Sequence, residues 1–169
     1  MFIESLNMFK QKNPDKLFFV VILGSDQGRK IYKKKIQRLV EQYRLIKDVL
    51  FIENCNNMPL AYKISDIVVN CAIEPEAFGR VAVEAQAMEK IILASNLGGA
   101  KETILDNKTG FLFKANDSND LTNKLSHIFE LDETTLKSMG IEGRKNVIKK
   151  FNVEKMCFST YSEYIKLIS

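Results

Sequence analysis

The sequence predicts an α/β fold built on a doubly wound parallel sheet, and two observations carry this prediction. Short uninterrupted apolar runs stand at 17–23, 49–52, 67–71 and 91–94, with a weaker one at 110–113. Strands buried on both faces, as in parallel sheets, show such runs, whereas half-exposed strands alternate. Helical periodicity fills the segments between them, and strand–helix alternation is typical of a doubly wound sheet.

One helix is expected ahead of the first strand, at 1–12. Those between strands are expected at 30–46, 59–64 (short) and 80–90, with a further short turn at 100–105. From residue 115 the pattern contains helices only, at 121–130, 133–150 and 153–168. Asn116, Asp117 and Ser118 offer helix caps ahead of the first of these. Gly140 and Gly143 are expected to weaken the middle of the second.

Size and composition limit the class of protein. The chain has 169 residues, of which 46% are hydrophobic and 27% charged. This is enough for one domain with a real core, and it excludes a disordered chain. No apolar run approaches the roughly 20 residues that a membrane helix needs. We expect a single domain over 1–169, with 115–169 as its helical C-terminal segment.

The net charge is +4, and one local basic run stands out, at 29–38. Its apolar residues recur at helical spacing, so its lysines are expected on the solvated face of a helix. Contact with an anionic membrane surface is the alternative. Aromatic residues do not alternate with the basic ones as an RNA-binding strand requires, and no nucleic-acid partner is expected.

Cysteine usage excludes several chemistries. The sequence has three cysteines, an odd number, and they are widely spaced: Cys55, Cys71 and Cys157. It has one histidine, His127. A zinc site and a disulfide framework are therefore not expected, and a reducing compartment fits best. We expect the cytoplasm, with the inner face of the membrane as the alternative location.

One segment suggests ligand chemistry, the stretch from Glu74 to Met88. It follows the apolar run 67–71 and opens the predicted helix 80–90, so it lies at the edge of a parallel sheet where ligands bind. A helix N-terminus suits a phosphate, and Gly79 allows close approach of a ligand to the backbone. Glu76 and Glu84 stand eight residues apart. Carboxylates in such places accept hydrogen bonds from sugar hydroxyls.

The spacing of the two glutamates alone does not decide between a site and ordinary helix structure. Glu76 could serve as a helix cap. Glu84 could be a solvated helix residue, paired with Arg80 at i,i+4 spacing.

The surrounding motifs decide in favour of a site. They read Asp66-Ile-Val-Val, Glu76-Ala-Phe-Gly-Arg-Val-Ala-Val-Glu84-Ala-Gln-Ala, Ile91-Ile-Leu-Ala-Ser, Gly98-Gly-Ala-Lys-Glu102-Thr-Ile and Thr109-Gly-Phe-Leu. Over more than forty residues, ordered and without gaps, this segment resembles the C-terminal, nucleotide-sugar-binding domain of GT-B retaining glycosyltransferases of the family 4 type. The resemblance implies the Rossmann-like C-terminal half of a GT-B fold.

The resemblance also implies residue roles. Glu76 is expected to contact the donor sugar near the reacting carbon, and Glu84 to hold the ribose. The segment Phe78, Gly79, Arg80 and Val81 is expected to meet the sugar and the diphosphate. The loop around Asn54 and Cys55 corresponds to the nucleobase pocket. Gly98 and Gly99 are expected to form a tight turn.

The implied reaction is metal-independent hexosyl transfer from a nucleotide sugar to an acceptor hydroxyl, with retained configuration and no cofactor beyond the donor. Surface polysaccharide or lipopolysaccharide synthesis is the expected setting. In this family an Arg and a Lys that grip the diphosphate stand just before the equivalent of residues 1–12, and they have no counterpart in the sequence. The N-terminal acceptor domain is expected to be absent as well. The expected partner is therefore an N-terminal glycosyltransferase half. A non-catalytic nucleotide-sugar binding or assembly module is the alternative. An unrelated flavodoxin-like or receiver domain lacks the expected acidic cluster.

Overall fold

The computed structural model describes residues 1–168, which divide into two compact units. Unit 1 comprises residues 1–61 and 113–131. Unit 2 comprises residues 62–112 and the described residues from 132 onward. The fold class is confirmed, because the described residues form parallel strands interleaved with helices. The expectation of a single domain over 1–169 stays a prediction.

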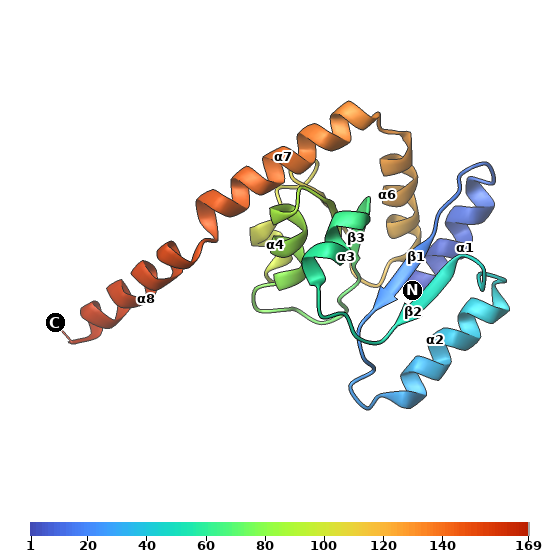
Figure 1. Ribbon diagram of the computed structural model, residues 1–169, viewed down its shortest axis with the longest axis horizontal. Helices are drawn as coiled ribbons and strands as arrows, with labels where there is room; N and C mark the ends of the chain where they lie inside the picture. The colour runs from blue at the N-terminus through green and yellow to red at the C-terminus, as the bar shows by residue number, and fades with distance from the viewer. Residues whose placement is uncertain (169) are drawn as a thin grey trace. The chain divides into compact units, whose positions relative to one another are not determined.

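Unit 1 contains a two-stranded sheet and its helices. β1 (Val20–Leu23) and β2 (Val49–Ile52) lie side by side and parallel, with Val20 opposite Val49 (Figure 1). The helices are α1 (Phe2–Lys12), α2 (Lys30–Gln42), α6 (Ser118–Glu130) and the first part of α3 (Met58–Ile64). The helix α1 contacts both α2 and α6.

The core of unit 1 centres on Phe9, which is 1% exposed. Its ring lies 4.8 Å from that of Phe129 and 5.7 Å from that of Phe18, centroid to centroid. A hydrogen bond also links α1 to α6, since Ser5 Oγ donates to Ser118 O at 3.0 Å. Burial of these rings therefore joins α1 to α6, two helices far apart in the sequence.

Unit 2 contains a three-stranded sheet in the order β3-β4-β5, with β3 and β4 parallel. Its elements are the last part of α3, β3 (Ile67–Asn70), α4 (Arg80–Ala87), β4 (Ile91–Ser95), α5 (Ala100–Thr103), β5 (Phe111–Phe113, all but its last residue), α7 (Glu133–Lys150) and α8 (Val153–Ile168). The central strand β4 is buried at all five positions, as its uninterrupted apolar run predicted.

The helix α7 packs closely on α4 and on the turn that follows it, and two glycines allow this. A Cβ on Gly140 would lie 2.3 Å from the carbonyl oxygen of Glu89. Arg144 of the same helix donates to the carbonyl of Ala87. The glycines expected to weaken α7 therefore mark the place where its backbone approaches a neighbour.

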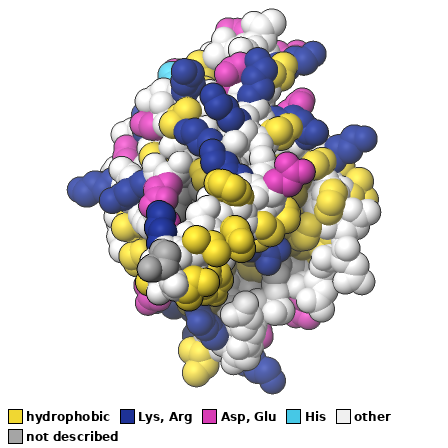
Figure 2. Space-filling view, turned by 90° about the vertical axis from the view of Figure 1, so that its left-hand side faces the viewer, with side chains coloured by type: hydrophobic (Ala, Val, Ile, Leu, Met, Phe, Trp, Pro, Cys, Tyr) yellow, Lys and Arg dark blue, Asp and Glu magenta, His cyan; other side chains and the backbone are white. Residues whose placement is uncertain are grey.

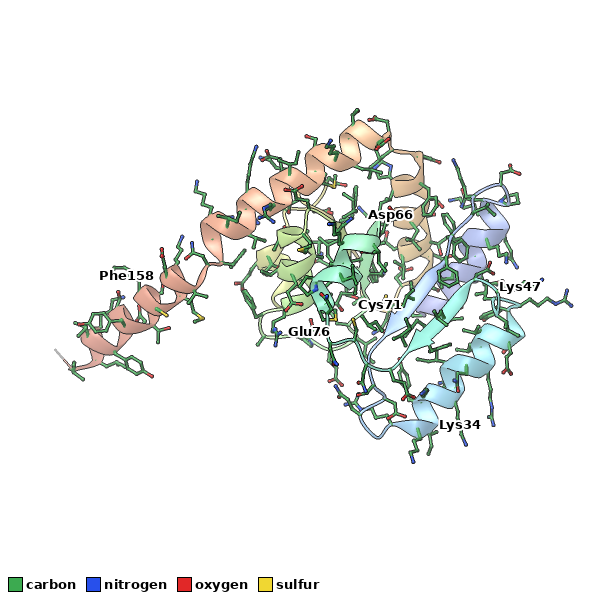
Figure 3. All side chains as sticks on the ribbon, viewed as in Figure 1. Lys34, Lys47, Asp66, Cys71, Glu76 and Phe158 are labelled. Atoms are coloured by element: carbon green, nitrogen blue, oxygen red, sulfur yellow. The ribbon has the colours of Figure 1, made fainter. Side chains whose placement is uncertain are left out.

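The helix α8 has no buried residue. Its exposed side chains include Phe158 (72%), Tyr161 (64%) and Leu167 (81%), and hydrophobic side chains are visible on this part of the surface (Figure 2). Phe158 projects from α8 (Figure 3).

The predicted ends of several elements are wrong by a few residues. The run from 17 to 23 forms a strand only from Val20, and Leu17 is 92% exposed. The helix predicted to reach 46 ends at Gln42, and the one predicted to reach 90 ends at Ala87. Arg44 and Glu89 take positive φ angles of 57° and 58°, which a right-handed helix does not continue through.

The basic face of α2 is solvated, as expected. Lys34 is exposed (Figure 3), and Lys33 pairs with Glu53 of the same unit. The predicted apolar face is present in part, because Val40 is buried but Tyr32 is 62% exposed. No helix within residues 1–168 is long and apolar enough to cross a membrane.

Candidate functional site

The segment singled out in the sequence is the loop 71–79, which joins β3 to α4 within unit 2. It leaves the carboxyl end of β3, where α/β sheets bind ligands. Glu76 and Phe78 are exposed, whereas Gly79 is buried at the start of α4. The loop therefore presents its side chains to solvent and anchors its end in the fold (Figure 3).

A pair of glycines supports this loop from beneath. Gly99 N donates to Glu76 O at 2.8 Å. A Cβ on Gly98 would lie 2.3 Å from Glu76 O, and one on Gly99 would lie 2.4 Å from Phe78 O. Real Cβ atoms do not approach backbone this closely, so only glycine at both positions lets the loop rest here. The predicted tight turn at Gly98 and Gly99 is confirmed, and it also packs against the loop 71–79 and supports it.

The Glu76 carboxylate is held at the start of α4. Asn70 Nδ2, from the last residue of β3, donates to Glu76 Oε2 at 3.0 Å. The same oxygen would lie 3.6 Å from a Cβ on Gly79. Asn70 Oδ1 in turn accepts from Ala72 N at 3.1 Å, which fixes the amide orientation. One oxygen of Glu76 is thus positioned, and a carboxylate has further lone pairs that can accept a hydroxyl.

Glu84 lies one turn inside α4 and is held from two sides. Tyr62 Oη donates to Oε2 at 2.8 Å, and Arg80 donates to Oε1 through Nη2 at 3.1 Å. Burial and the hydrogen bond to Glu84 both raise the pKa of Tyr62, so its hydroxyl stays protonated and keeps donating. The i,i+4 pair considered from the sequence is therefore present.

The N-terminus of α4 has no capping side chain. Gly79 takes φ 75° and ψ 60°, a left-handed conformation that costs glycine little. The first N–H groups of a helix lack partners within it, and the helix dipole adds partial positive charge there. Beside them, the Arg80 side chain is 84% exposed. This end of α4 can therefore receive an anion such as a diphosphate.

The remaining predicted residues lie elsewhere. Asn54 and Cys55 follow β2 in unit 1, where Asn54 is exposed and Cys55 is half-buried. The structure does not bring them together with Glu76 and Glu84 within one unit. In unit 2, burial raises the pKa of the Cys71 thiol to about 12, so it is not a nucleophile at neutral pH. Within residues 1–168, no three His, Cys, Asp or Glu side chains are grouped to hold a metal ion.

Sequence reasoning missed two residues of this site. Asn70 could have been found, because a polar residue ends an otherwise apolar strand at the edge where ligands bind. Tyr62 left no such signal, since it contacts Glu84 from 22 residues away along the chain. Both act on the two carboxylates that the motif supplies.

The parallel strands and the loop 71–79 agree with a Rossmann-like domain of the GT-B glycosyltransferase class. Residues 1–146 match the family described as Glycosyl transferases group 1. The chain belongs to this family.

Relatives and solved structures agree with the assignment. The capsular polysaccharide biosynthesis glycosyltransferase CapM of Staphylococcus aureus is 26% identical over 82% of this chain and 45% of its own length. The crystal structure of a glycosyltransferase from Rickettsia africae superposes with a TM-score of 0.90 at 30% identity, covering 99% of this chain and 43% of that one. The crystal structure of the C-terminal domain of LpcC from Francisella tularensis superposes with a TM-score of 0.78 at 29% identity. It covers 90% of this chain and 78% of that one. The chain spans less than half the length of the first two.

Proposed function

We propose that this chain is the donor-binding half of a retaining glycosyltransferase, which transfers a hexosyl group from a nucleotide sugar to an acceptor hydroxyl. The single observation that carries the proposal is the loop 71–79 with α4. It places a positioned carboxylate, an uncapped helix N-terminus and a second carboxylate within one short segment. A nucleotide sugar presents sugar hydroxyls, a diphosphate and ribose hydroxyls, which are complementary to these three features.

The geometry supports a role for each residue. Glu76 accepts hydroxyls of the donor sugar, while Asn70 holds its carboxylate. The backbone from Phe78 to Val81 receives the diphosphate. The Arg80 side chain also binds the diphosphate in this proposal. Its exposed ion pair with Glu84 contributes little stability, so Arg80 can leave Glu84 and pair with a phosphate instead. Positive charge at this point stabilises the leaving diphosphate as the sugar–phosphate bond breaks.

Glu84 binds the ribose in this proposal. Its oxygens each accept a protein hydrogen bond, and a carboxylate retains further lone pairs for the vicinal hydroxyls. Tyr62 keeps the group in one orientation, so binding does not require ordering it.

The remaining roles rest on the family alone. These are the nucleobase contact at Asn54 and Cys55, retention of configuration, and a place in surface polysaccharide synthesis. The acceptor site and the completed active site are assigned to an N-terminal half.

Calorimetry with UDP, GDP and ADP tests the donor site. We expect one nucleotide to bind the chain, and Glu84→Gln to weaken it about tenfold or more, because a hydrogen bond to a charged group contributes about 1.5–3 kcal/mol. Glu89→Gln is the matched control, since Glu89 pairs with Arg144 at the surface of the same unit. Absence of binding by all three nucleotides at millimolar concentration contradicts the proposal, as do equal losses in both variants.

A second assay separates an enzyme half from a binding module. Sugar transfer is measured with the chain alone and with a co-expressed N-terminal glycosyltransferase half. Transfer only in the second case supports the enzyme half. Nucleotide binding without transfer in either case supports the non-catalytic alternative.

A further inference from the structure

The helix α2 presents a cluster of basic side chains to solvent. Val40 of this helix is buried, whereas Lys34, Lys35 and Arg38 are exposed. Residues three and four apart are neighbours on a helix, so these three side chains form one contiguous cluster. Figure 3 shows Lys34 on the side of α2 that faces away from β2. The three basic residues and Ile31, which adjoins them at the same spacing, are called here the outer face of α2.

The outer face has no acidic partner within the part of the chain that the structure describes. Lys33 pairs with Glu53, but no ion pair among residues 1–168 involves Lys34, Lys35 or Arg38. Three cationic side chains are therefore available to an anionic partner outside the chain.

The basic residues do not stabilise α2 itself. Arg29 stands at its N-cap and Lys30 and Lys33 in its first turn, where there is no acidic residue and no capping side chain. Positive charge is unfavourable beside the positive end of a helix dipole. Lys30 with Lys34, and Lys34 with Arg38, are like-charged pairs at i,i+4 spacing, which destabilise a helix. A partner outside the chain accounts for this charge better than helix stability does.

An apolar side chain stands among the cations and distinguishes the kind of partner. Ile31 is 87% exposed. It lines an open depression together with Lys34, Lys35, Arg38, Leu39 and Gln42. A lipid surface suits this arrangement, because anionic headgroups pair with cations while an apolar side chain enters the acyl boundary. Single-stranded nucleic acid needs several stacking aromatic side chains, and Tyr32 is the only aromatic residue of α2.

We propose that the outer face of α2 docks unit 1 on an anionic lipid bilayer, with Lys34, Lys35 and Arg38 on lipid phosphates and Ile31 among the headgroups. Charge complementarity carries the proposal, since three unpaired cations meet a surface of negative charge. Each basic residue near such a surface strengthens binding about fivefold, so three give a preference of about a hundredfold for anionic over neutral lipid. The helix α2 belongs to unit 1, so the proposal does not depend on the donor site in unit 2.

Vesicle sedimentation gives the first test. The partition of the chain is measured into vesicles of phosphatidylcholine with and without phosphatidylglycerol. The ratio of the two partition coefficients is compared, because binding that does not depend on charge, such as that of the exposed apolar side chains of α8, cancels from it. We expect a ratio of about a hundred, falling as salt is added.

The triple variant Lys34→Gln, Lys35→Gln, Arg38→Gln is expected to bring this ratio to within about fivefold of one. Its Tm is expected to equal or exceed that of wild type, because like-charged pairs have been removed from α2. A loss of binding is then not a loss of the fold.

The matched control removes the same charge from another helix. Lys137, Lys149 and Lys150 of α7 are exposed, and their replacement by glutamine changes the net charge equally. This variant is expected to keep the ratio of wild type, because the cluster on α2 is intact.

A fluorescent reporter gives a second, independent test. The sequence contains no tryptophan, so Ile31→Trp introduces a single one at the outer face. Its emission is expected to shift to shorter wavelength with anionic vesicles and to stay unchanged with neutral ones. Ile148→Trp is the control, because Ile148 is 55% exposed on α7, and its emission is expected to stay unchanged with both.

The proposal is overturned if wild type binds anionic and neutral vesicles equally, or if both triple variants lose the preference to the same extent. It is also overturned if the two tryptophans respond alike. Tighter binding of single-stranded RNA than of anionic vesicles, lost only in the α2 variant, overturns it as well, because the partner is then a nucleic acid.

Discussion

Gly140 and Gly143 of α7 provide a matched pair in which one extra methyl group is expected to have opposite outcomes. In an exposed helix, alanine in place of glycine stabilises by about 0.8–1 kcal/mol. Helix propensity alone therefore predicts that Gly140→Ala and Gly143→Ala both stabilise the protein. The structure predicts otherwise for the first of them.

At Gly140 the new Cβ would lie 2.3 Å from the carbonyl oxygen of Glu89 and 3.0 Å from its carbonyl carbon. An ordinary contact is about 3.4 Å or longer, so α7 or the turn at Glu89 must move by about 1 Å. Both are backbone, and Glu89 already has a strained φ of 58°. Overpacking typically costs about 1–3 kcal/mol, and contact with backbone on both sides places this case in the upper part of that range, about 2–3 kcal/mol, which exceeds the gain in propensity.

At Gly143 the new Cβ meets Gln86 Cγ at 3.2 Å and Thr109 O at 3.3 Å. A shift of a few tenths of an ångström relieves both contacts, so the propensity gain and the packing cost nearly cancel. We expect Gly140→Ala to lie about 1–2 kcal/mol below wild type in urea unfolding, and Gly143→Ala within about 0.5 kcal/mol of it. The corresponding loss of Tm for Gly140→Ala is about 2–8 °C. Equal stability of the two variants would refute the close approach of α7 to Glu89.

Three further predictions concern the site and its surroundings. Gly99→Ala places a Cβ 2.4 Å from Phe78 O, so it should displace the loop 71–79 and weaken nucleotide binding in calorimetry by about tenfold or more; unchanged affinity contradicts the seating role of Gly99. Tyr62→Phe removes the 2.8 Å hydrogen bond to Glu84, and a typical hydrogen bond of about 0.5–1.5 kcal/mol implies about twofold to tenfold weaker binding. A Tyr62→Phe variant that binds as tightly as wild type refutes the positioning of Glu84. Asp132 caps α7, and hydrogen bonds from Thr134 and Thr135 lower its pKa from 3.8 to about 2. Its charge therefore stabilises the fold fully above about pH 4, and this contribution is lost as the pH falls towards about 2. The stability difference between wild type and Asp132→Asn should shrink over that range, and a difference independent of pH contradicts the assignment.

The sequence predicted those features that depend on local pattern. The apolar runs gave the strands, because a strand buried on both faces needs apolar residues throughout. The cap at Asp117 was found from residue type, and its side chain accepts from Asn119 N and Asp120 N. The ends of α2 and α4 were missed because Arg44 and Glu89 take positive φ angles. Such angles are uncommon for arginine and glutamate, so the residue type did not predict them.

The candidate site was predicted as a motif but not as an arrangement. Glu76, Gly79 and Glu84 were singled out by their place after a strand and by the surrounding motifs, because the spacing of the two glutamates alone did not decide. The contact of Tyr62 with Glu84 and the support that Gly98 and Gly99 give to the loop 71–79 join segments that are distant in sequence. Local sequence pattern does not predict such contacts. Gly140 shows the same limit, since a helix-weakening residue in the sequence becomes a point of close packing in the fold.

The most direct test of the donor site is an amide chemical-shift titration of the chain with UDP, GDP and ADP in turn. For the nucleotide that binds, we expect the largest shifts at Gly79, Arg80 and Val81, because their N–H groups form the uncapped start of α4. Smaller shifts are expected at Glu76 and Glu84. Shifts confined to the lysines of α2, or no shift at millimolar nucleotide, would contradict the assignment of the loop 71–79 and α4 as the donor site.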